Sequence, residues 1–108
     1  MTNALLALLL SLGILTTRDV VRDMSTAAGV DPQLAACIVT WESSWVVDEV
    51  STSGAVGLWQ IKPETAKWAA GKLGMETYDL VNPVDNTALA LYILQEFPTW
   101  FLVYEWCI

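Results

Sequence analysis

Three prolines mark where helices are expected to begin. Pro32 follows Asp31 and Pro83 follows Asn82, and both preceding residues favour the N-cap of a helix. Proline suits the first helical position because its missing N–H would have no intrahelical partner there. Together with Pro63, these signals predict helices over about residues 32–44, 63–73 and 83–97.

The rest of the chain beyond residue 17 shows helical periodicity as well. Apolar residues recur three and four positions apart before Gly29, which is a natural helix end. A last short helix is predicted from Trp100, Val103, Tyr104 and Cys107. No segment alternates convincingly with the two-residue period of a strand, and 108 residues leave little room for a second domain. We therefore predict one all-α domain over residues 18–108.

The charge balance and the missing residue types limit the chemistry. Five basic and twelve acidic residues give a formal charge of −7, which argues against nucleic acid as a partner. The chain has no His and two Cys, so Ser-His and Cys-His nucleophiles, imidazole metal sites and four-thiolate zinc sites are excluded. We expect no metal and no cofactor. Carboxylates, hydroxyls and aromatic rings must carry the function.

Residues 1–17 differ from the rest of the chain. Residues 4–15 are apolar except for Ser11, and no charge appears before Arg18. This run is shorter than the roughly 20 residues of a membrane-spanning helix, but its length suits the hydrophobic region of a secretory signal. Two interpretations stay open: export or membrane association through residues 4–15, or a first helix buried against the core or a partner.

Cys37 and Cys107 are the only thiols. In an oxidising compartment a Cys37–Cys107 bridge would stabilise the domain by about 3–5 kcal/mol on a loop-entropy model. In a reducing cell both would be ordinary buried thiols. Export and the bridge are therefore expected together.

Glu42 is the candidate catalytic residue. On a helical wheel, Leu34, Ile38, Trp41 and Trp45 form one apolar stripe, and Glu42 lies at its boundary. We expect Trp41 and Trp45 to crowd the carboxyl, and burial of this kind raises a pKa. An acid that stays protonated near neutral pH is what cleavage of a glycosidic bond requires. Periodicity alone also fits a solvated surface glutamate.

The loop after this helix, residues 46–61, combines turn-forming and apolar residues. Its turn formers are Ser51, Ser53, Gly54 and Gly57, and its apolar residues are Val56, Leu58, Trp59 and Ile61. Surface connections are usually polar, so we expect this loop to pack onto the domain.

Four blocks occur in a fixed order along the chain. They are Asp31-Pro32-Gln33-Leu34, Trp41-Glu42-Ser43-Ser44-Trp45, Gly54-Ala55-Val56-Gly57-Leu58-Trp59-Gln60-Ile61-Lys62-Pro63-Glu64-Thr65-Ala66 and Asn82-Pro83-Val84-Asp85-Asn86. This pattern resembles the soluble lytic transglycosylase family of the lysozyme-like superfamily, which is related to goose-type lysozymes. The resemblance covers about residues 20–104 and implies a small lysozyme-like helical domain.

The resemblance implies a reaction. Glu42 would be the catalytic acid and base for the β-1,4 bond between N-acetylmuramic acid and N-acetylglucosamine in peptidoglycan. Attack by the sugar's own 6-hydroxyl gives a 1,6-anhydro product, whereas attack by water makes the enzyme a lysozyme. The substrate's N-acetyl group can stabilise the cationic centre, so no second carboxylate is needed. Asp48 and Glu49 are interpreted as loop carboxylates.

The resemblance also implies substrate-binding residues: Ser43, Gly57, Leu58, Trp59, Gln60 and Tyr104. Ser43 either contacts substrate or supports the helix end, and Trp59 either faces a sugar ring or belongs to the core. Tyr104 matches the tyrosine of an Ala-Tyr-Asn signature, although Val103 and Glu105 replace its neighbours. This departure and the few residues that follow predict a cleft wall that is partly absent or supplied by another molecule.

The implied partner is the glycan strand of peptidoglycan, with a larger envelope or phage assembly as a further expectation. The implied location is periplasmic or extracellular, at the cell envelope, or in a phage virion. An alternative function is an inactive peptidoglycan-binding or structural domain, in which the same Trp-rich groove holds glycan without cutting it.

Overall fold

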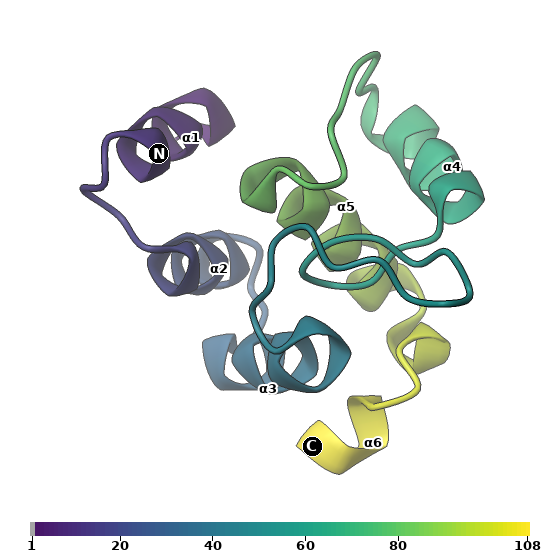
Figure 1. The fold of residues 1–108 in the computed structure, drawn as a ribbon. Helices are drawn as coiled ribbons and strands as arrows, with labels where there is room; N and C mark the ends of the chain where they lie inside the picture. The colour runs from purple at the N-terminus through teal and green to yellow at the C-terminus, as the bar shows by residue number, and fades with distance from the viewer. Residues whose placement is uncertain (1) are drawn as a thin grey trace.

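The computed structural model describes residues 2–108 as helices joined by loops (Figure 1). The elements are α1 (Asn3–Ser11), α2 (Thr17–Ala27), α3 (Pro32–Ser43), α4 (Pro63–Leu73), α5 (Pro83–Glu96), the 3-10 turn η1 (Pro98–Trp100) and α6 (Tyr104–Cys107). Among these described residues the only β-type pairings are isolated bridges, between Val50 and Val56 and between Val56 and Ile61. The all-α prediction is confirmed.

The helices begin at the predicted start signals. The Asp31 carboxylate accepts a hydrogen bond from the backbone N–H of Gln33 at 2.9 Å, which caps α3. The Asn82 side chain accepts from the N–H groups of Val84 and Asp85 at 2.9 and 3.2 Å, which caps α5. These caps satisfy backbone donors that a helix start leaves without partners.

Helix α5 lies at the centre of the domain (Figure 1). It packs against α1, α2, α4 and η1. Its buried residues occupy more than one face and include two polar side chains: Val84, Asn86, Thr87, Leu89, Ala90, Leu91, Ile93 and Leu94. A helix buried nearly all round serves as the scaffold on which the loops are placed.

The predicted apolar stripe of α3 is wrong in part. The buried residues of this helix are Ala35, Ile38, Val39 and Ser43. Trp41 is 61% exposed, and its ring meets Trp106 of α6 edge-on at a centroid distance of 5.4 Å. The buried face of α3 is set by its packing against α2, which a helical wheel alone does not locate.

The two ends of the chain are also helical. In α1 only Leu6 is buried, and the helix packs against α2 and α5. No helix within residues 2–108 is long and apolar enough to cross a membrane. Export or membrane association through residues 4–15 stays a prediction. The predicted final helix is shorter than expected, because η1 and a turn precede its start at Tyr104.

Candidate active site

A groove of about 760 Å³ opens beside the C-terminal end of α3. The end of α3, the loop 46–61, the start of α4 and the segment around η1 all contribute to it. Its lining residues are Glu42, Ser51, Ser53, Ala55, Gln60, Lys62, Glu64, Thr65, Trp100, Phe101 and Leu102. The volume falls in the range of ligand-binding clefts.

Glu42 is the partly buried acid of this groove. Burial raises the pKa of its carboxyl above the ordinary glutamate value, because a carboxylate loses hydration there. Within residues 2–108 its carboxyl forms no hydrogen bond or ion pair. The predicted direction of the pKa shift is therefore confirmed, and the side chain is available to a ligand in the groove.

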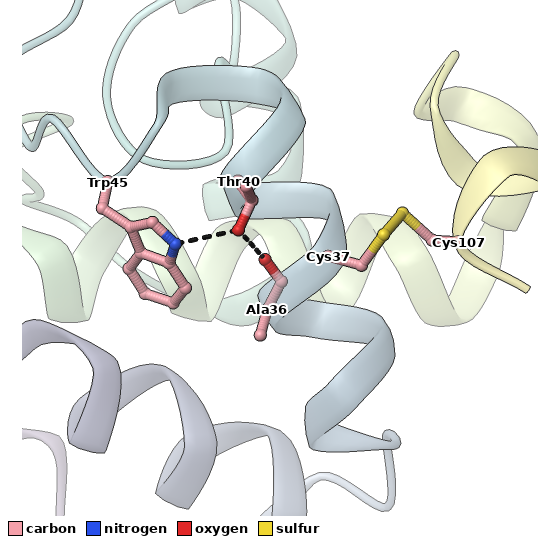
Figure 2. The surroundings of a disulfide bond; sticks show 5 residues. All are labelled: Ala36, Cys37, Thr40, Trp45 and Cys107. Carbon is pink, nitrogen blue, oxygen red and sulfur yellow. Dashed lines mark hydrogen bonds between the residues drawn. A yellow bond between two sulfur atoms is a disulfide. The ribbon is translucent and has the colours of Figure 1, made fainter.

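The tryptophans that were expected to crowd Glu42 lie elsewhere. The indole N–H of Trp45 donates to the Thr40 hydroxyl at 2.9 Å, and the Arg18 guanidinium lies 4.3 Å from the ring centroid (Figure 2 shows Trp45 and Thr40). Trp41 packs against Trp106. The expected cause, burial, is confirmed, but Trp45 does not continue the helix one turn after Glu42, because residues 44 and 45 adopt left-handed backbone angles that turn the chain at the end of α3. Apolar residues that line the groove together with Glu42 include Ala55 and Phe101.

Ser43 is buried directly after the acid. Its hydroxyl donates to the Val39 carbonyl at 3.3 Å and accepts from the Trp45 N–H at 3.2 Å. The hydroxyl is therefore engaged with the backbone at the end of α3. This placement matches the helix-support interpretation of Ser43.

A single buried amide fixes the loop 46–61. Asn86 of α5 accepts from the Trp59 N–H at 2.9 Å and donates to the carbonyls of Val56 and Leu80 at 3.0 and 2.9 Å. These bonds pair the Trp59 N–H and the Leu80 carbonyl and add a second donor to the Val56 carbonyl, which also accepts from the Ile61 N–H. The expected packing of this loop onto the domain is confirmed.

Gly57, Leu58 and Trp59 lie beneath the groove rather than in it. A side chain at Gly57 would collide with Asn86 and with the Leu80 carbonyl, so only glycine permits this approach. Trp59 is 0% exposed, and its indole N–H donates to the Thr87 hydroxyl at 3.1 Å. It has no free face for a sugar ring, and the core interpretation describes its position.

Gln60 does line the groove. Its side-chain nitrogen donates to the carbonyls of Glu49 and Gly57 at 3.1 and 3.0 Å. An amide nitrogen has two hydrogens, so both are used and the side-chain oxygen is left to accept from a ligand. Nearby, the hydroxyls of Ser51 and Ser53 lie 3.0 Å apart.

Several groove residues were not identified as site residues from the sequence. Lys62, Glu64 and Thr65 lie at the start of α4, only a few residues after Gln60, and this proximity was a usable signal. Trp100 to Leu102 form the wall contributed by the C-terminal segment, for which the sequence carried no motif. Asp48 and Glu49 do not line the groove.

Tyr104 lies outside the groove. It borders a different cavity together with residues of the α2–α3 turn such as Gly29 and Asp31. The tyrosine that the sequence matched to a family signature is therefore not brought to Glu42 in this structure. The C-terminal wall is formed by the residues just before it.

A disulfide ties the C-terminal segment to the helix that carries the acid. Cys37 of α3 and Cys107 of α6 are bonded, with Cα atoms 5.7 Å apart and a sequence separation of 70 (Figure 2). Figure 2 also shows that the Trp45 ring, which comes from the loop after α3, lies on the other side of α3 from Cys37. Of the two states left open for these cysteines, the structure has the bridge.

The all-helical fold and the partly buried acid over a groove define a lysozyme-like domain. The family model described as "Transglycosylase SLT domain" matches residues 19–107. The chain therefore belongs to this family, as the sequence blocks indicated.

Two curated relatives share a shorter region. Both are described as "Endo-type membrane-bound lytic murein transglycosylase A", one from Klebsiella pneumoniae subsp. pneumoniae and one from Klebsiella pneumoniae strain 342. Each is 55% identical over 40 residues, which is 37% of this chain and 20% of the relative. The chain thus matches about a fifth of the length of these relatives.

Proposed function

We propose that this protein is a peptidoglycan lytic transglycosylase that cleaves the β-1,4 bond between N-acetylmuramic acid and N-acetylglucosamine. The observation that carries the proposal is the Glu42 carboxyl, which has a raised pKa and opens into a groove of about 760 Å³. Membership of the transglycosylase family supports the choice of substrate.

In the first step, protonated Glu42 gives its proton to the glycosidic oxygen while the bond from that oxygen to C1 breaks. The positive charge that develops at C1 is stabilised by the oxygen of the substrate's own N-acetyl group. Glu42 leaves this step as a carboxylate. The raised pKa favours the form that can donate at the start.

In the second step, the sugar's 6-hydroxyl attacks C1 and Glu42 takes its proton. The new bond closes a 1,6-anhydro ring, and the acid returns to its protonated form. Water in place of the 6-hydroxyl gives a reducing end, which is the lysozyme outcome. One carboxyl serves both steps, so the reaction uses no second acid.

The remaining groove residues have complementary roles. The Gln60 side-chain oxygen would accept from a sugar hydroxyl or an N-acetyl N–H, because its two N–H donors are already engaged. Ser51 and Ser53 would offer hydroxyls on the same side of the groove. Ser43, Gly57, Leu58 and Trp59 are positioning residues that hold the end of α3 and the loop in place.

The proposal includes a cell-envelope location, since peptidoglycan lies there. The disulfide supports an oxidising compartment such as the periplasm or the cell exterior. The exposed apolar side chains of α1 and the loop after it, Leu5, Leu8, Leu12 and Ile14, are compatible with membrane association.

Muropeptide release from purified cell walls, followed by mass spectrometry, tests the function. We expect anhydro ends with the wild type and a loss of about 10²–10⁴-fold in rate with Glu42→Gln, which keeps the shape but removes the transferable proton. Reducing ends would identify a lysozyme. A near wild-type rate for Glu42→Gln would show that the catalytic assignment is wrong.

Three further variants serve as matched controls for a lost carboxylate. Asp48→Asn and Glu49→Gln lie outside the groove and are expected to keep most of the activity. Glu64→Gln removes the other acid of the groove. If Glu64→Gln abolishes cleavage as fully as Glu42→Gln, the single-acid mechanism is wrong.

An inactive glycan-binding domain is the second candidate. The position of Tyr104 outside the groove favours it, because a residue matched to the family's signature is then missing from the site. Intact glycan after incubation, together with binding to the cell walls, is the result that supports this candidate.

A further inference from the structure

A second cavity adjoins the groove of Glu42. It measures about 350 Å³ and is lined by Glu64, Thr65, Trp68, Ile93, Phe97 and Trp100. Three of these residues, Glu64, Thr65 and Trp100, also line the groove of Glu42. The two cavities therefore share a border formed by these three residues.

The second cavity is built mainly from exposed aromatic rings. Trp68, Phe97 and Trp100 are 41%, 50% and 55% exposed. The Trp68 ring lies 5.8 Å from the ring of Phe97 and 5.8 Å from that of Tyr92, measured between centroids. These contacts hold the rings of α4 and α5 in place while leaving surface open to a ligand.

We propose that this cavity, the aromatic subsite, binds a further sugar unit of the same glycan strand whose scissile bond lies at Glu42. The inference rests on the proposed function, because it extends that substrate beyond the reacting bond. Trp68 and Phe97 would pack against the apolar C–H face of a pyranose ring. Glu64, on the border, would accept hydrogen bonds from sugar hydroxyls.

The chemistry of the cavity favours a glycan. A sugar ring combines an apolar face with hydroxyl groups around its edge, and the cavity combines aromatic surface with one carboxylate and one hydroxyl at its border. A glycan strand is also continuous, so a sugar bound beside Glu42 brings its neighbours within reach of the shared border. The other occupant to be tested is a second copy of this chain, since exposed aromatic surface also occurs in protein interfaces.

The test measures binding of soluble β-1,4-linked N-acetylglucosamine hexamer to the Glu42→Gln protein, which keeps the oligomer intact if Glu42 is the acid. Adding Trp68→Ala is expected to weaken hexamer binding by about 3- to 10-fold, the scale of one aromatic contact. Trp68 is chosen because it lines the aromatic subsite but not the groove of Glu42. Isothermal titration calorimetry gives the affinity.

Two other variants separate binding from folding. Trp106→Ala removes an exposed tryptophan that lines neither cavity, and it should leave hexamer affinity within about twofold. Trp68→Phe keeps a ring and should recover most of the affinity. If Trp68→Ala does not fold, Phe97→Ala, directly after the end of α5, tests the same surface and should also lower the affinity.

Unchanged hexamer affinity in folded Trp68→Ala, or an equal loss with Trp106→Ala, overturns the aromatic subsite. A concentration-dependent dimer that Trp68→Ala abolishes, seen by sedimentation together with unchanged hexamer affinity, assigns the surface to a second copy and also overturns it. Failure of the proposed function is a separate result. It appears as muropeptide release by Glu42→Gln, which is measured without any change at Trp68.

Discussion

The two walls of the groove are held in different ways. The loop 46–61 is fixed from below by Asn86 and Thr87, whose hydrogen bonds reach the backbone and the indole of the buried Trp59. The C-terminal wall, around Trp100 to Leu102, belongs to a segment that the Cys37–Cys107 disulfide closes onto α3. The loop wall is fixed by buried hydrogen bonds, whereas the C-terminal wall is held by the disulfide and by Phe101, which is buried in the core with its ring 5.6 Å from that of Trp59.

Because the two walls are held differently, a mutation can lower the stability of the fold or open the groove, depending on which wall it affects. Loss of the loop's hydrogen bonds leaves polar groups buried without partners, so it affects the whole domain. Loss of the disulfide removes the covalent tether of a segment that has several exposed side chains, such as Leu102, which is 90% exposed, and that keeps the buried Phe101 and Val103 as its apolar anchors. Mutations of the buried residues beneath the loop wall should therefore lower the stability of the whole domain. Reduction of the disulfide should mainly increase the motion of the C-terminal wall.

Removal of the buried amide is expected to have the largest effect. Asn86→Ala leaves the Trp59 N–H and the Leu80 carbonyl without their partner, whereas the Val56 carbonyl still accepts from the Ile61 N–H. At about 1–3 kcal/mol for each of the two groups left unpaired, we expect a loss of about 2–6 kcal/mol in the free energy of unfolding. Urea denaturation measures it.

Asn82→Ala is the matched control, since it removes an amide that caps the same helix near the surface. It should cost about 1 kcal/mol. Equal effects of the two substitutions would contradict the view that the loop wall depends on Asn86.

Removal of the disulfide tests the other wall. In the double variant Cys37→Ser/Cys107→Ser, the loop-entropy model predicts a loss of about 4 kcal/mol. Hydrogen exchange should rise in residues 98–108, while the amides of the loop 46–61 keep their protection. Activity should fall with the opened wall, and reduction of the wild type should have the same effect.

The redox state of Cys37 and Cys107 in the native protein provides a check on this prediction. An intact mass about two hydrogens below that of a reduced sample shows the bridge. If protein isolated from its own compartment has two thiols that can be alkylated, the native protein does not contain the Cys37–Cys107 disulfide. Uniform exchange changes across both walls would show that they are not independent.

The sequence predicted the helices well because their ends are encoded locally. Asp31, Asn82 and the prolines that follow them act within one turn of chain. Glu42 was singled out because it lies in one of the blocks that carry the family resemblance, and it does line the groove, although its catalytic role stays a prediction. Its surroundings were not predicted, because burial around the end of α3 depends on where α2 and the C-terminal segment pack.

The groove itself depends on contacts between distant residues. The Asn86 amide reaches back 30 positions to Val56, and no local pattern marks that bond. From the sequence, Trp59 fitted both a sugar-binding and a core position. In the structure it lies in the core, where its indole N–H donates to the Thr87 hydroxyl. Aromatic content alone does not distinguish a buried ring from an exposed one such as Trp68.

The smallest predicted effect concerns Glu42, which lies between the two walls. Because burial raises its pKa in the folded protein, the native state holds its proton to higher pH than the unfolded state does. Stability should therefore fall as pH rises from the ordinary glutamate pKa through the raised one. Glu42→Gln removes this dependence and should stabilise the domain near neutral pH by about 1 kcal/mol or less.

Thermal unfolding of the wild type and of Glu42→Gln across this pH range measures the difference, with Glu49→Gln as the control. The gap between wild type and Glu42→Gln should close at low pH, where the wild-type carboxyl is protonated in both states. Cleavage by the wild type should decline over the same rise in pH, since the donating form is depleted. If reduction of the disulfide opens the C-terminal wall and hydrates Glu42, both pH dependences should move toward the ordinary glutamate pKa. Unchanged profiles after reduction would mean that the C-terminal wall does not contribute to the burial of the acid.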